Sequence, residues 1–81
     1  MTLNQKKTLN KKIVQISKLS NKLRLHFIYD EGLIFEDAEG AVLEILKECM
    51  NPKNLNIEDC NVCIIALKSL LKNYEFEGQK S

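Results

Sequence analysis

The sequence predicts an all-α protein folded as a compact three-helix bundle. Apolar residues recur at intervals of three and four in three successive segments, which is the pattern of amphipathic helices. Gly32 and the Asn51-Pro52 pair separate these segments at suitable places for turns. We therefore expect helices over about 5–30, 34–50 and 56–76 in one helical domain spanning 1–81, with 76–81 as a flexible tail.

The first predicted helix is defined by two faces with the same period. One face is apolar and consists of Leu9, Ile13, Ile16, Leu19, Leu23 and Phe27. The opposite face carries Lys7, Lys11, Lys18 and Lys22, which follow one another at steps of four, seven and four. Thr2 or Asn4 is expected to cap the start of this helix.

Residues 23–35 also fit a β-hairpin, which would make the fold α+β. The alternating positions are Leu23, Leu25, Phe27 and Tyr29, and Gly32 suits a tight hairpin loop. The helical interpretation is preferred because its period extends over nineteen residues, whereas the alternation covers only four apolar positions. Gly32 then caps the helix end.

The second and third helices have clearer boundaries. Acidic residues occupy the first turns of the second helix, where negative charge is favoured, and Asn51-Pro52 ends it. Asn56 is a good N-cap for the third helix, and Asp59 follows it by three positions. The second helix has an apolar stripe made of Ile34, Ala38, Ala41, Val42, Ile45, Leu46 and Cys49. The third helix has a broad apolar face made of Cys60, Cys63, Ile64, Leu67, Leu70, Leu71 and Tyr74.

Charge is divided unequally along the chain despite a net charge of +1. Residues 1–29 hold seven basic residues and no acidic one, whereas residues 30–81 hold all eleven acidic residues and five lysines. Such a division indicates a nucleic acid or an acidic partner, although a solvated basic face explains it equally well. The residues expected to bind an anion or a partner are Lys7, Lys11, Lys18, Lys22 and Arg24.

Several apolar residues do not fit the predicted core stripes. They are Val14, Leu25, Ile28, Leu43 and Ile65. Single exposed apolar residues are normal, but five of them in a chain this short indicate a partner surface. We therefore expect these residues to form an interface with a protein partner or in a homo-oligomer.

The sequence contains little that would support catalysis, and we predict that the protein is not an enzyme. His26 is the single histidine, and no phosphate-binding loop, dinucleotide fingerprint or H-E-x-x-H motif is present. The C-x-x-C of Cys60 and Cys63 lacks a redox-protein context, and a Cys₃His zinc set with Cys49 and His26 fits no standard finger. We predict no metal and no cofactor, with the cysteines filling the core.

These observations predict a small helical interaction protein that acts by binding another macromolecule, as a regulator, inhibitor, adaptor or immunity-type protein. Size and helical character suggest a phage or bacterial effector by analogy. The alternative is an accessory protein that binds nucleic acid or a phosphate ligand, without sequence specificity, through the basic first helix. No secretory signal or membrane span is evident, so a cytoplasmic location is expected.

Overall fold

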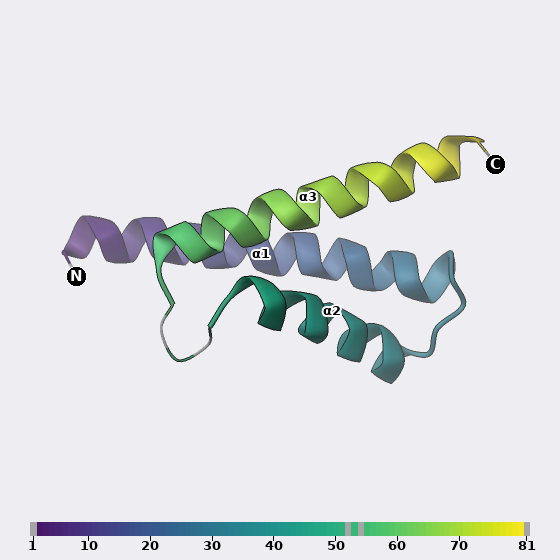
Figure 1. Cartoon of the computed structure of the whole chain (residues 1–81), viewed down its shortest axis with the longest axis horizontal. Coiled ribbons are helices and arrows are strands. Elements are labelled where there is room, and N and C mark those ends of the chain that lie inside the picture. Colours follow the sequence, from purple (N-terminus) through teal and green to yellow (C-terminus); the bar gives the residue numbers. More distant parts are fainter. Residues whose placement is uncertain (1, 52, 54, 81) are drawn as a thin grey trace.

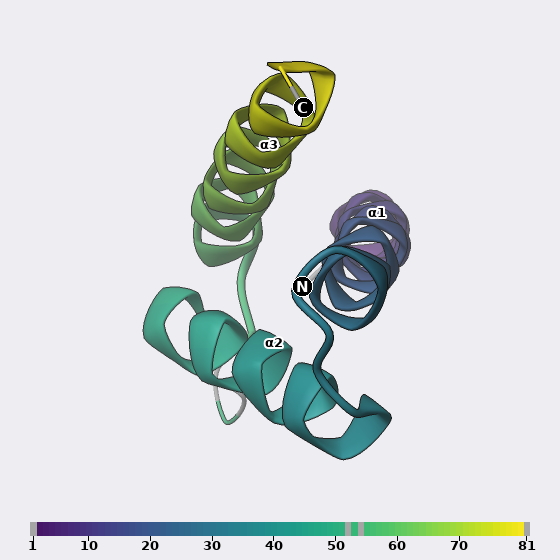
Figure 2. The same cartoon turned by 90° about the vertical axis from the view of Figure 1, so that its right-hand side faces the viewer.

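The computed structural model is a three-helix bundle, as the sequence predicts. It describes residues 2–51, 53 and 55–80, with side chains described up to residue 74. The helices are α1 (Leu3–Tyr29), α2 (Phe35–Cys49) and α3 (Ile57–Lys80), and no strand occurs within those ranges. α1 and α3 run side by side in the same direction, and α2 returns antiparallel across them (Figures 1 and 2).

The start of α1 is fixed by a reciprocal capping box. The Thr2 hydroxyl accepts from the Gln5 N–H at 3.2 Å, and Gln5 Oε1 accepts from the Thr2 N–H at 2.9 Å. Two N–H groups that lack helical partners are thereby satisfied. The capping prediction is confirmed for Thr2, whereas Asn4 lies inside the helix.

The stretch that fitted both a helix and a hairpin is helical through Tyr29, so the hairpin alternative is wrong. Gly32 follows in the left-handed conformation, with φ of +74°, and the Leu33 N–H donates to the Phe27 carbonyl at 2.9 Å. Glycine adopts this conformation without the steric cost of a Cβ atom. The chain can therefore reverse within five residues and enter α2.

The cap of α3 matches the expectation from the sequence, but its end does not. The Asp59 N–H donates to Asn56 Oδ1 at 2.8 Å, and Asn56 Nδ2 donates to Asp59 Oδ2 at 3.1 Å. α3 extends to Lys80, beyond the expected end at residue 76. A single glycine at position 78 costs a helix only about 1 kcal/mol, which is too little to stop it. Residue 81 lies outside the described residues.

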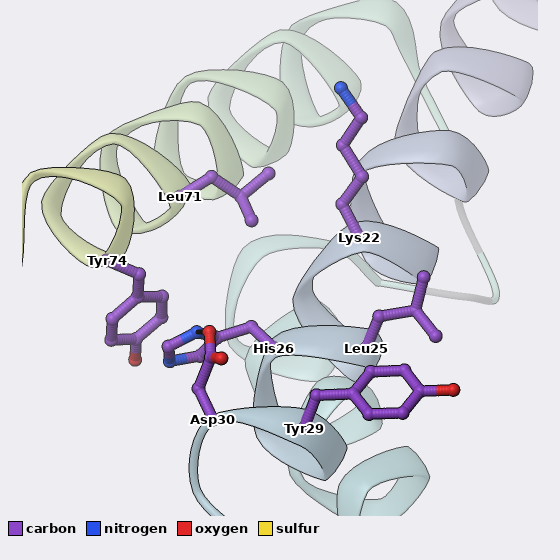
Figure 3. A pocket seen from close by; sticks show the side chains of 7 residues that line it. All are labelled: Lys22, Leu25, His26, Tyr29, Asp30, Leu71 and Tyr74. Atoms are coloured by element: carbon purple, nitrogen blue, oxygen red, sulfur yellow. Dashed lines mark hydrogen bonds and ion pairs between the residues drawn. The ribbon is translucent and has the colours of Figure 1, made fainter. Parts of the chain in front are cut away.

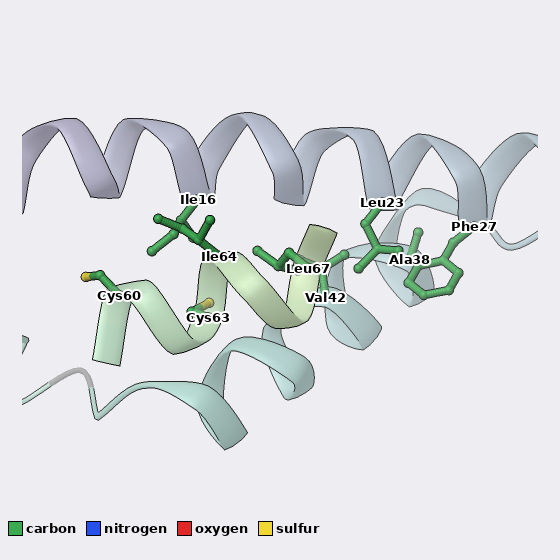
Figure 4. Packing of buried hydrophobic residues seen from close by; sticks show 9 residues of the cluster. All are labelled: Ile16, Leu23, Phe27, Ala38, Val42, Cys60, Cys63, Ile64 and Leu67. Carbon is green, nitrogen blue, oxygen red and sulfur yellow. The ribbon is translucent and has the colours of Figure 1, made fainter. Parts of the chain in front are cut away.

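The core lies along the seam where the three helices meet (Figure 4). Its buried residues are Ile16, Leu23, Phe27, Ala38, Val42, Cys60, Cys63, Ile64 and Leu67. All nine were on the predicted apolar faces. Two residues of those faces, Ile13 and Ile34, are exposed instead, because a shared period fixes direction around a helix but not depth within the bundle.

None of the helices, over their described residues, contains a segment long and apolar enough to cross a membrane.

Candidate functional site

The first candidate site is a basic surface on α1, which we call the lysine row. It consists of Lys7, Lys11, Lys18 and Lys22, all exposed. Within the described part of the chain, none of the four side chains forms an ion pair or a hydrogen bond with another residue. The row lies on the side of α1 opposite its buried residues, so the bundle does not use these charges.

The structure separates Arg24 from the lysine row, although the sequence grouped them. Arg24 is half-buried, its guanidinium Nη2 donates to Asn21 Oδ1 at 2.6 Å, and its Cζ lies 5.4 Å from the centre of the Phe35 ring. This cation–π contact joins the end of α1 to the start of α2. Arg24 therefore helps to hold the α1–α2 corner.

The five apolar residues expected at an interface lie on three different helices. Val14 and Leu25 are exposed on α1, Leu43 on α2 and Ile65 on α3. Ile28 is instead half-buried and packs against the core. Leu43 lines a shallow apolar groove of about 310 Å³ with Leu46, Lys47, Met50 and Leu55.

Sequence reasoning missed three exposed large apolar residues beside the turn from α1 to α2. We call Tyr29, Ile34 and Phe35 the turn-end surface, and they are 78%, 63% and 56% exposed. These residues flank the turn within seven positions of the chain. Their exposure was detectable in principle, because neither Tyr29 nor Phe35 fits the apolar stripe of its helix.

A pocket of about 400 Å³ lies between the C-terminal halves of α1 and α3 (Figure 3). It is lined by Lys22, Leu25, His26, Tyr29, Asp30, Leu71 and Tyr74. The His26 ring stacks on Tyr74 with centroids 4.0 Å apart, and His26 Nδ1 donates to Asp30 Oδ2 at 2.6 Å. The other ring nitrogen, Nε2, is buried without a hydrogen bond and lies 3.6 Å from Glu31 Oε1.

The pair of His26 and Asp30 lies at the C-terminal end of α1. Asp30 is the C-cap, where a negative charge is unfavourable, and the contact with His26 offsets that effect. None of the seven residues that line the pocket is a serine, threonine or cysteine, so the pocket lacks the hydroxyl or thiol that such a pair commonly activates.

The three cysteines lie in or beside the core as free thiols. Burial, followed by Asp59, raises the pKa of the Cys60 thiol. Burial, the neighbouring Cys49 and then Cys60 raise the pKa of Cys63 to about 11. Raised pKa values keep thiols protonated and unreactive, unlike the thiolate of a redox C-x-x-C. No group of three or more His, Cys, Asp or Glu residues among the described side chains is placed to hold a metal ion.

Comparison of the chain with protein-family models, with curated proteins and with solved structures gave no match.

Proposed function

We propose that this protein is a small non-enzymatic helical protein that acts by binding another macromolecule, as a regulator, inhibitor or adaptor does. The observation that carries this proposal is its apolar surface. Eleven large apolar residues of the described chain are exposed, whereas nine residues form the buried core. A small bundle that exposes this many large apolar side chains is suited to burying some of them against a partner.

The turn-end surface is the best candidate for the centre of that contact. Tyrosine, phenylalanine and arginine are the residue types enriched in interface cores and binding hot spots. Tyr29 and Phe35 are exposed here, and the stacking of Arg24 on Phe35 holds that ring in place. An interface of ordinary size buries roughly 800 Å² on each partner. The whole chain exposes 6039 Å², so such a contact would cover only a small part of it.

A capture experiment with matched variants tests this function. The test variant carries Tyr29→Ser, Ile34→Ser and Phe35→Ser, and the control carries Leu3→Ser and Val62→Ser at exposed positions of α1 and α3. We expect the wild type and the control to retain the same macromolecule from a native-host lysate, and the test variant to lose it. The purified pair should then form a defined complex by light scattering. Equal capture by all three proteins, or no complex on mixing, would contradict the proposal.

An accessory nucleic-acid-binding function is the second candidate, and the unpaired lysine row favours it. A row of exposed ammonium groups neutralises phosphates and releases counterions, which gives affinity without sequence preference. The test is a mobility-shift assay with duplex DNA and RNA. Binding should fall steeply with salt and vanish in the variant Lys11→Glu, Lys18→Glu, Lys22→Glu. No shift even at about 50 mM salt would exclude this function.

A further inference from the structure

The outer surfaces of α1 and α2 carry opposite charges that the bundle itself does not use. α1 contains seven basic residues and no acidic one, whereas α2 contains five acidic residues and a single lysine. Asp37, Glu44 and Glu48 are exposed on α2, and none of them pairs with another described residue. We call these three the acidic row.

The two rows have the same spacing along their helices. The acidic row steps by seven and then four positions, which places its members on one side of α2. Lys11, Lys18 and Lys22 step by seven and four as well. Laid side by side in the same direction, the two rows therefore bring every lysine opposite a carboxylate.

The spacing also matches when the two helices run in opposite directions, because the steps of the lysine row are the same in both directions. Read backwards from Lys18, the steps to Lys11 and Lys7 are again seven and four. The match therefore does not depend on which way the two helices run.

A mid-helix glycine lies in the gap of the acidic row, and the fold of the single chain does not explain it. Gly40 is exposed, and a Cβ atom added there would meet nothing within 4 Å. Glycine in a helix interior is less stable than alanine by roughly 0.5–1 kcal/mol, so the position carries a cost without a local benefit. A glycine that the monomer does not need is expected where another surface approaches closely.

We propose that the lysine row of one copy of this chain binds the acidic row of a second copy, with Gly40 allowing the two helices to approach closely. Because the contact joins two different surfaces, it either forms twice in a two-fold dimer or continues to further copies as a ring or a chain. The near-neutral net charge of +1 offers little repulsion to such association. Exposed ion pairs contribute only about 0.2–1 kcal/mol each, so the association is weak and salt-sensitive.

Charge reversal of each row, separately and in combination, tests this contact. One variant carries Lys11→Glu, Lys18→Glu and Lys22→Glu, and the other carries Asp37→Lys, Glu44→Lys and Glu48→Lys. Nuclease-treated full-length protein is studied by sedimentation velocity at low salt, up to about 1 mM. We expect the wild type to associate with increasing concentration, each variant alone to remain monomeric, and their equimolar mixture to associate again.

Two controls separate this contact from general charge effects. The first control changes three exposed lysines outside α1 and carries Lys53→Glu, Lys68→Glu and Lys72→Glu. Its net charge equals that of the α1 variant but its lysine row is intact, so association should persist. Gly40→Met changes no charge and should weaken association roughly 10-fold, equivalent to about 1.4 kcal/mol. Circular dichroism checks that the variants fold.

The proposal is overturned if the wild type stays monomeric at low salt, if the mixed variants fail to associate, or if association disappears after nuclease treatment. The last result would point to nucleic acid bridging the lysine rows. These outcomes are distinct from failure of the capture experiment, which concerns the turn-end surface and leaves both rows intact.

Discussion

α1 and α2 are joined by a short turn, yet they contribute to the bundle in different ways. α1 buries three large side chains, Ile16, Leu23 and Phe27, whereas α2 buries only Ala38 and Val42. The free energy gained on transferring apolar side chains from water increases with the apolar area that is buried. The buried side chains of α1 therefore contribute more to the stability of the bundle than those of α2. On their outer sides the two helices differ again, since one is basic and the other acidic.

This difference shows which positions the fold determines and which it leaves free. In α1 the apolar positions are needed for the core, and the lysines can vary without loss of packing. α2 has less core to maintain, and its exposed Gly40 and acidic row are features that its packing does not require. Helices with few buried contacts also open at lower free energy, so α2 is expected to exchange its amide hydrogens before the middle of α1.

The largest stability effect is expected in the core of α1. Leu23 is completely buried, and Leu23→Ala removes apolar contacts and leaves a cavity. The free energy of unfolding should fall by about 2–5 kcal/mol, measured by urea denaturation. Leu25→Ala on the exposed side of the same helix is the control and should change it by no more than about 0.5 kcal/mol.

The free energy of unfolding should fall at high pH because of a buried thiol between α2 and α3. The Cys63 thiol, next to Cys49 of α2, has its pKa raised from 9.0 to about 11, chiefly by burial. Between these values the unfolded thiol ionises while the folded thiol stays protonated. The unfolded state then binds fewer protons, so the free energy of unfolding falls as pH rises.

That fall can be measured by urea denaturation between pH 8 and 11. One thiol contributes at most about 1.4 kcal/mol per pH unit within this window. Cys63→Ala should flatten the dependence, leaving the smaller part due to Cys60, whose pKa is also raised by burial. An unchanged slope in Cys63→Ala would show that this thiol is not the group responsible.

A smaller effect is expected in the core of α2. Val42→Ala removes two buried methyl-sized groups and should cost about 1–2 kcal/mol, less than Leu23→Ala. Leu43→Ala on the exposed side is its control. If Val42→Ala were as damaging as Leu23→Ala, the two helices would be equally important to the core, and the contrast drawn between them would be wrong.

The smallest effect has the opposite sign. Gly40→Ala meets open space and should stabilise the chain by roughly 0.5–1 kcal/mol in thermal unfolding. Gly32→Ala is the informative comparison, because Gly32 has φ of +74° and a side chain there costs roughly 1–2 kcal/mol. Stabilisation at position 40 and destabilisation at position 32 would show that only Gly32 is required by the fold.

The sequence predicted the helices well because their signals are local. The capping residues Thr2 and Asn56 and the apolar period placed most helix ends within one or two positions. The end of α3 was misplaced, since no residue near position 76 stops a helix strongly. The burial of Ile13 and Ile34 was not predicted correctly. Burial depends on where the neighbouring helices lie, and the apolar period of a single helix carries no information about that.

Candidate sites were predictable only where one helix carries them. The lysine row is such a case, because helical geometry alone decides that its members share a face. Arg24 was grouped with the row through nearness in sequence, but its contact with Phe35 requires the placement of α2. The pocket between His26 and Tyr74 joins residues 48 positions apart, and only the parallel packing of α1 and α3 brings them together.

Cross-linking between isotopically light and heavy copies of the chain tests most directly whether the two charged rows bind each other. A carbodiimide joins a lysine amine to a carboxylate only where the two are in contact, and mass spectrometry distinguishes mixed-isotope products from links within one copy. We predict mixed-isotope amide bonds from Lys11, Lys18 or Lys22 to Asp37, Glu44 or Glu48, lost at high salt. Cross-links confined to single copies, or intermolecular links that avoid α2, would contradict it.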